Sequence, residues 1–234
     1  MTKNLYPEIA NAGSLSKALD MEFEKLASPL RCTIFENAEQ LPFAYARVEN
    51  KKRFSQVYMA ANEKLYLPDF WKEGVSLADG QTDNISKLAE VLHYWLSADP
   101  SIKALENKFQ FVQANEKAEA FEENNEIEYS WNLILNDRSR AAIRPVVELA
   151  IKDNVLSKLF PFTSLTRLCF SRCTGYPYTY DAPIVIPIDE NSFEVRMSED
   201  KVVGRGTAAE AIKMVRDNLP LDIKPAVKGT AEDL

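Results

Sequence analysis

Two blocks of short strand-like runs, separated by a helical middle, constrain the fold of this chain more than any other feature. The first block comprises the runs 31–36, 43–49, 54–60 and 64–67, with a hairpin turn at 50–53. The second block comprises the runs 163–171, 182–187, 192–197 and 201–203. We therefore predict an α+β protein, with antiparallel sheet modules in its N- and C-terminal parts packed with a helical middle.

Helical spacing of apolar residues is clearest in 82–98. Further helices are predicted at 14–28, within 101–160 and at 207–218. Thr207 and Glu210 have the spacing of a capping box at the start of the last helix.

These elements predict an N-terminal α+β module at 1–100, a helical middle at 101–160 and a β-rich module with a closing helix at 161–220. The polar tail at 221–234 contains a proline and is expected to be loose. We expect all of these parts to form one compact unit.

Composition limits the classes of partner. The chain has 35 acidic and 28 basic residues, which give a net charge of −7. Nucleic acid is not expected as a partner, because a phosphate backbone needs a concentrated Lys/Arg surface. No run of about 18 apolar residues and no secretory leader is visible, so we expect no membrane span. Three cysteines, an odd number, fit reduced thiols and a cytoplasmic location.

Residues with catalytic or metal-binding potential are few. His93 is the only histidine, and its place beside the apolar stripe of helix 82–98 predicts a boundary or surface residue. Cys169 and Cys173 lie too far apart along one strand to share a metal without a bend, so buried thiols are predicted. Gly204-Arg205-Gly206 lacks the other residues of a phosphate loop. We therefore predict no catalytic residue, no metal and no cofactor, while enzymatic activity stays open.

Two features favour a binding surface. The segment 116–128 is rich in glutamate and would suit a basic partner, although such a run is also typical of a solvated helix end. Its glutamates are Glu116, Glu119, Glu122, Glu123, Glu126 and Glu128. The turn after Gly175 displays Tyr176, Tyr178 and Tyr180. Tyrosines offer contact area at low entropic cost, but these three would also suit packing against the helical middle.

Three arginines, Arg167, Arg172 and Arg205, come from the C-terminal strands. They would hold an anion if they converged, but the abundance of acidic residues favours ordinary ion pairs. If the arginines converge, a ligand pocket would be lined by Arg167, Arg172 and Tyr176.

The segment LSKLFPFTSLTRLCFSRCTGYPYTYDAPIVIP (156–187) contains a Pro-Phe-Thr-Ser step, a strand ending in Phe-Ser and a Thr-Gly-Tyr-Pro turn. In these features it resembles a bacterial family labelled as natural product biosynthesis proteins of unknown function. Segments 206–220 and 77–96 are also similar to that family. The resemblance implies the same α+β fold and assigns no catalytic residue.

Three functional hypotheses follow. The first is a cytoplasmic binding protein of the immunity type, which masks a partner protein such as a bacterial toxin, with a basic protein as a suitable partner. The second is an accessory protein or enzyme of natural product biosynthesis that binds a small molecule. The third is a structural or regulatory subunit, which the sequence does not separate from the first.

Overall fold

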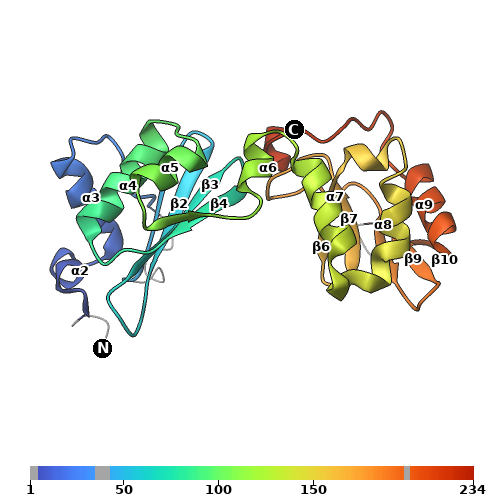
Figure 1. Ribbon diagram of the computed structural model, residues 1–234, viewed down its shortest axis with the longest axis horizontal. Helices are drawn as coiled ribbons and strands as arrows, with labels where there is room; N and C mark the ends of the chain where they lie inside the picture. The colour runs from blue at the N-terminus through green and yellow to red at the C-terminus, as the bar shows by residue number, and fades with distance from the viewer. Residues whose placement is uncertain (1–4, 35–42, 198–200) are drawn as a thin grey trace. The chain divides into compact units, whose positions relative to one another are not determined.

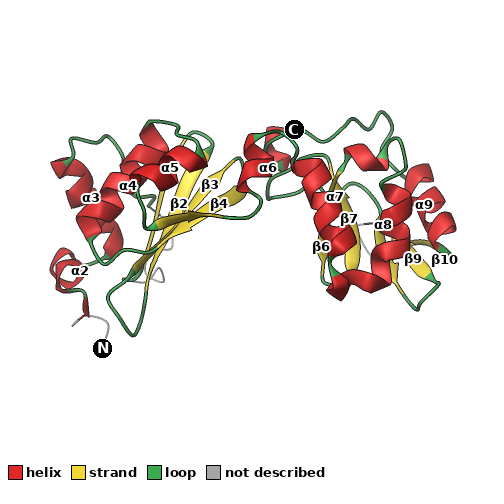
Figure 2. Cartoon of the chain, viewed as in Figure 1, coloured by secondary structure: helices red, strands yellow, loops and turns green. Residues whose placement is uncertain are grey.

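The computed structural model describes residues 5–34, 43–197 and 201–234, and the chain divides into two compact units (Figure 1). We call Met1–Glu119 the N-terminal unit and Ala120–Leu234 the C-terminal unit. The α+β class is confirmed, because the described residues of each unit combine helices with a five-stranded antiparallel sheet (Figure 2).

The packing of all parts into one compact unit stays a prediction, and the division between the two units falls inside the predicted helical middle. The reason is a short strand in that region, β5 (Val112–Ala114), which pairs with β4 (Val75–Gly80). This pairing joins the first part of the helical middle to the N-terminal sheet.

The N-terminal sheet has the strand order β1-β2-β3-β4-β5, so strands that follow one another in the chain are neighbours. The elements not yet given are α2 (Pro7–Ala12), α3 (Leu15–Lys25), β1 (Tyr45–Asn50), β2 (Arg53–Met59), β3 (Tyr66–Lys72), α4 (Ile85–Ser97) and α5 (Ile102–Lys108). Helix α3 contacts β1, and α4 contacts β1, β2 and β3. Helices 14–28 and 82–98 are thus confirmed, as is the hairpin at 50–53.

The predicted strand 31–36 is only partly described, because residues 35 and 36 lie outside the described ranges. Within the described part, Cys32 forms an isolated antiparallel bridge with Val48. Strand β4 was not predicted, and it follows a turn at Glu73 and Gly74, both of which have positive φ.

The C-terminal sheet has the strand order β10-β9-β8-β7-β6, again with chain neighbours side by side. Its strands are β6 (Phe160–Ser164), β7 (Arg167–Ser171), β8 (Ile184–Pro187), β9 (Phe193–Arg196) and β10 (Val202–Gly206). The helices are α6 (Ala118–Glu122), α7 (Glu126–Asn136), η1 (Arg138–Ile143), α8 (Arg144–Ala150), η2 (Leu156–Lys158), α9 (Ala208–Asp217) and η3 (Ala231–Asp233), and the unit boundary falls within α6.

The run 163–171 was predicted as one strand, but it contains the turn between β6 and β7. Leu165 takes a left-handed conformation with a φ of 56° and is 88% exposed. Leucine is typical of strands and rarely takes a positive φ, so the residue pattern of 163–171 gave no indication of a turn at Leu165.

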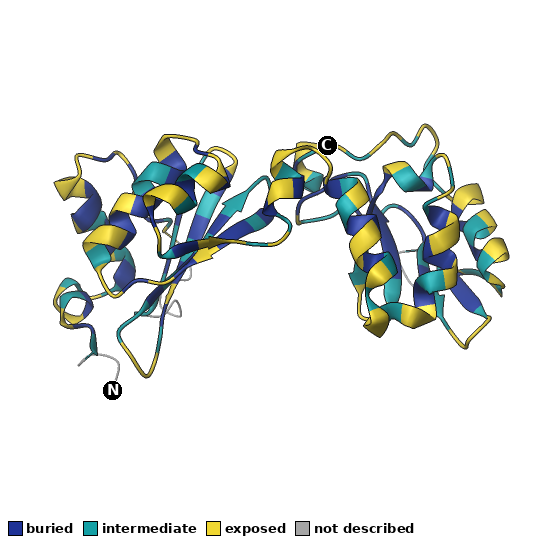
Figure 3. Cartoon of the chain, in the orientation of Figure 1, coloured by how far each residue is buried: buried dark blue, intermediate teal, exposed yellow. Residues whose placement is uncertain are grey.

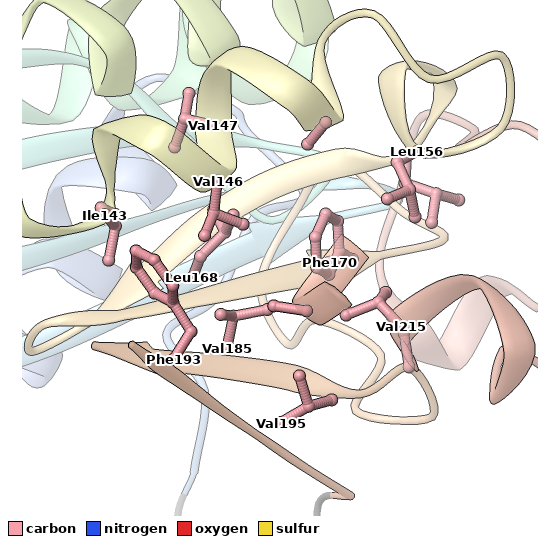
Figure 4. Packing of buried hydrophobic residues seen from close by; sticks show 14 of the residues in the cluster. Ile143, Val146, Val147, Leu156, Leu168, Phe170, Val185, Phe193, Val195 and Val215 are labelled. Carbon is pink, nitrogen blue, oxygen red and sulfur yellow. The ribbon is translucent and has the colours of Figure 1, made fainter. Parts of the chain in front are cut away.

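The core of the C-terminal unit lies between one face of the sheet and the helices α7, α8 and α9. Figure 4 shows Val146 and Val147 of α8 and Val215 of α9 close to Phe170 and Val185 of the sheet. Leu168 on β7 is paired with Val185 on β8, which is paired with Val195 on β9, so the three side chains share one sheet face. All three are fully buried. Buried and exposed positions alternate around the helices that cover this face (Figure 3).

The last helix, α9, is confirmed with its predicted cap. The Thr207 hydroxyl accepts a hydrogen bond from the Glu210 N–H, and the Glu210 carboxylate accepts one from the Thr207 N–H. This reciprocal pair satisfies two backbone donors at the start of the helix.

Candidate binding surface

A group of stacked aromatic rings lies on the C-terminal sheet, on the face opposite the core. We call Phe160, Phe162, Tyr176, Tyr178 and Tyr180 the tyrosine cluster. Tyr178 stacks on Phe162 with 4.4 Å between ring centroids and on Phe160 with 5.6 Å. Tyr176 meets Tyr178 edge to face at 6.0 Å, and Tyr180 meets Phe162 edge to face at 5.6 Å. The geometry of these pairs is favourable for aromatic rings.

Strand alternation places the two phenylalanines on this face. Phe162 is paired with Cys169 in the β6–β7 ladder, so both lie on the face opposite Leu168 and Phe170, which belong to the core. The motif Phe-Pro-Phe at 160–162 carries this pattern in the sequence, but its relation to the tyrosines depends on the fold of the following turn.

Hydrogen bonds to a buried serine close that turn. The Ser171 hydroxyl donates to the Cys173 carbonyl at 2.8 Å and accepts from the N–H groups of Cys173 and Thr179 at 3.0 and 3.2 Å. The Arg172 N–H donates to the Thr179 hydroxyl at 2.9 Å. These bonds join the two ends of the turn and set the position of the tyrosines between them.

The C-terminal tail supports the same turn, in contrast to the predicted loose tail. The Thr174 and Gly175 N–H groups donate to the carbonyls of Val227 and Gly229, and the Ala231 N–H donates to the Pro177 carbonyl. Composition alone did not indicate this, because the tail is polar and its partners lie some 50 residues earlier.

The tyrosines differ in exposure. Tyr176 is 61% exposed and Tyr180 is 52% exposed, whereas Tyr178 is half-buried between them. Burial raises the pKa of Tyr178 and of Tyr180, so both phenols are neutral at physiological pH. The cluster therefore presents two accessible tyrosine rings, Tyr176 and Tyr180, beside the stacked rings of Tyr178 and Phe162.

The acidic segment is divided between the units. Glu116 and Glu119 belong to the N-terminal unit, and the other four glutamates belong to the C-terminal unit. The exposed members are Glu116, Glu119, Glu122, Glu123 and Glu128. Glu126 is only 4% exposed, because it lies on the same side of α7 as the buried Ser130 and Ile134.

The three arginines do not form an anion site. The Arg172 guanidinium pairs with Asp181, with an N–O distance of 2.6 Å. Arg205 pairs with the buried Glu194 at 2.6 Å, and Arg196 pairs with the same carboxylate. Hydrogen bonds from Arg196 and Arg205 lower the pKa of Glu194. Arg172 and Arg205 therefore form ion pairs with acidic residues, which is the alternative that the acidic composition favours.

Arg167 is half-buried and lies opposite Ser164 in the β6–β7 ladder. It shares its sheet face with Cys169, two residues along the same strand. Burial raises the pKa of the Cys169 thiol to about 11, although the nearby Arg167 opposes this shift. Cys169 and the other two cysteines are free and buried, which confirms the predicted buried thiols.

The remaining candidate groups show no catalytic arrangement among the described residues. The His93 Nδ1 lies 2.8 Å from the Ser28 hydroxyl, on a half-buried side of α4. Within residues 5–34, 43–197 and 201–234, no three His, Cys, Asp or Glu residues are grouped to hold a metal. No helix in these ranges has the length and apolar character needed to span a bilayer.

A second candidate site, a groove of about 1020 Å³ in the N-terminal unit, contains His93 but none of the glutamates, arginines or turn tyrosines that the sequence proposed as contact residues. Its aromatic residues are Tyr94, Phe109 and Phe111. The alternation of Lys108, Phe109, Gln110 and Phe111 was a usable signal, but that segment was interpreted as part of a helical region.

Comparison with protein families identifies the region that carries the tyrosine cluster. Residues 125–230 match the model of a family of unknown function, DUF6193. The DUF6193 match begins at the residue before α7 and ends in the C-terminal tail, so it lies entirely within the C-terminal unit. Segment 77–96 lies outside the DUF6193 match, and the family description names no biosynthetic role. No curated protein and no solved structure matches the chain.

Proposed function

We propose that this protein binds a partner protein through the tyrosine cluster, and that it acts in the cytoplasm as a neutralising protein of the immunity type. The observation that carries the proposal is the exposure of Tyr176 and Tyr180 above the half-buried Tyr178. Tyrosines that are already packed in place before binding lose little entropy on contact, and tyrosine is enriched among the residues that dominate binding energy.

The acidic segment supports a basic partner. The exposed glutamates of its C-terminal part, Glu122, Glu123 and Glu128, would attract a basic surface and increase the association rate at low salt, an effect that falls as ionic strength rises. A toxin with a basic active cleft is one class of protein that such a surface would suit.

The test is a comparison of three proteins in pull-downs from the source organism. The double variant Tyr176→Ala, Tyr180→Ala should lose the partner that the wild type captures. The control Tyr58→Ala removes a tyrosine of similar exposure, 49%, from the other unit and should retain it. Capture of the same partner by the double variant would remove the tyrosine cluster from the proposal.

A second measurement tests the neutralising role. The captured partner should inhibit growth when it is expressed alone and should be tolerated when this protein is expressed with it. A partner that cells tolerate alone would contradict the immunity type while leaving protein binding in place.

Charge reversal tests the acidic segment separately. Glu123→Lys should slow association with the purified partner and reduce its dependence on salt. Glu190→Lys is the matched control, because Glu190 is also exposed in the C-terminal unit but lies in a different turn. Equal association rates for the two variants would exclude electrostatic steering by this segment.

A second candidate function is small-molecule binding in natural product biosynthesis, either as an accessory protein or as an enzyme. The groove beside Tyr94 favours it, because concave sites lined by aromatic residues with a few polar groups are typical of ligand binding. The sequence resemblance at 156–187 is the only support for the biosynthetic context.

A further inference from the structure

The groove in the N-terminal unit lies along the outer side of α4. Lys87, Glu90, Tyr94 and Ser97 recur every three or four residues and therefore line one side of the helix. The opposite side of α4 is occupied by core residues such as Trp95. The groove is completed by Leu26, just after α3, and by the turn that leads from α5 into β5.

Three aromatic rings form the apolar part of this groove. Phe109 contacts Tyr94, with ring centroids 5.8 Å apart, and contacts Phe111 at 5.9 Å. Phe109 is almost fully buried, whereas Tyr94 and Phe111 are half-buried and keep part of their surface accessible. A flat apolar ligand could therefore cover the accessible surfaces of these rings.

A lysine ammonium group lies over the same rings. The Lys108 Nζ is 3.9 Å from the centroid of Tyr94 and 5.6 Å from that of Phe109. Within the described ranges no carboxylate lies within ion-pair distance of Lys108 or Lys87. The ring face attracts the ammonium group but does not neutralise its charge, so an anion remains a favourable partner for Lys108.

The polar groups around the rings favour an anion over a cation. Lys87 and Lys108 outnumber the single carboxylate, Glu90, and both have exposed side chains that can turn toward a ligand. His93 also lines the groove, and its Nδ1 lies within hydrogen-bond distance of the Ser28 hydroxyl. Two lysines are too few for a nucleic-acid surface.

From these observations we infer that the groove binds a small planar aromatic carboxylate, with its rings against Phe111 and the part of Tyr94 that Lys108 leaves uncovered, and its carboxylate paired with Lys108. The groove volume of about 1020 Å³ is at the upper end of the range for small-molecule sites. The inference rests on the second candidate function, small-molecule binding, and adds the chemical class of the ligand. It is independent of protein binding by the tyrosine cluster.

The test is an amide NMR titration of the full chain with two probes, naphthalene carboxylate and the neutral naphthalene methanol. The carboxylate should shift the amide signals of α4 and of 108–111, and it should bind about ten-fold more tightly than the alcohol, as expected for one charge-assisted contact. Lys108→Met keeps most of the aliphatic chain and should reduce carboxylate affinity to that of the alcohol. Lys103→Met is the matched control, because Lys103 is an exposed lysine of α5 outside the groove, and it should change neither affinity.

The outcomes separate the inference from the function on which it rests. Equal affinities for the two probes, or an unchanged carboxylate affinity in Lys108→Met, would overturn the anionic ligand class while supporting small-molecule binding in the groove. Absence of any shift at these amides with either probe would overturn both the ligand class and small-molecule binding by this groove.

Discussion

Replacing Tyr178 by alanine should destabilise the C-terminal unit, because this ring links the strand β6 to the exposed tyrosines. A buried tyrosine removes about 150–250 Å² from water, so a half-buried one removes roughly 100 Å². At about 25 cal/mol per Å² this area contributes about 2.5 kcal/mol. The close stack on Phe162 adds about 0.5–1.5 kcal/mol, which gives an expected loss of roughly 3–4 kcal/mol in the free energy of unfolding.

Urea unfolding followed by fluorine NMR measures this loss of stability for the C-terminal unit separately from the N-terminal unit. In protein labelled with fluorotryptophan, Trp131 reports the C-terminal unit, whereas Trp71 and Trp95 report the N-terminal unit. Tyr178→Ala should lower the urea midpoint of the Trp131 signal only. Tyr178→Phe keeps the stacked ring and should stay within about 0.5 kcal/mol of wild type. A loss for Tyr178→Ala as small as that for Tyr178→Phe would refute the structural role of the stack.

Three further predictions concern the C-terminal unit. Folding lowers the pKa of Glu194, so ionised Glu194 stabilises the protein fully above its unfolded pKa, and this stabilisation is lost as the pH falls through its folded pKa. Glu194→Gln should therefore make stability, measured by urea midpoints, depend less on pH in the acid range. Thr207→Ala removes the capping box and should cost about 1 kcal/mol, with Thr207→Ser close to wild type in the same assay. Cys169 should react with iodoacetamide far more slowly in the folded protein than in urea, because burial raises the pKa of its thiol to about 11. Equal reaction rates in the two conditions, measured by mass spectrometry, would contradict the protection of this thiol by folding. Each result can be assigned to this unit through Trp131 or through the modified peptide.

Local sequence patterns predicted most of the individual elements. The 82–98 and 207–218 helices were visible because apolar spacing and capping residues act within a few positions of one another. The hairpin at 50–53 was visible for the same reason, since strand alternation breaks at a polar turn. Ion pairing of Arg172 and Arg205 followed from the excess of acidic residues.

The sequence did not predict features that depend on distant partners. β5 is three residues long and becomes a strand only because β4 lies beside it. The tail acquires its structure from hydrogen bonds to residues near 174, and Glu126 is buried because of the side of α7 on which it falls. None of these positions carries a local pattern that distinguishes it from a loop or a solvated helix.

The sequence alone determined the α+β class and indicated three tyrosines as candidate contact residues, whereas the structure decided that Tyr176 and Tyr180 are the exposed ones. Tertiary structure decided that the chain forms two compact units and that Tyr178 stacks on Phe160 and on Phe162. It also decided that Lys108 lies over Tyr94. The physical reason is range: propensity, alternation and capping act between neighbours in the chain, whereas a stack or a groove requires side chains that folding brings together from separate elements.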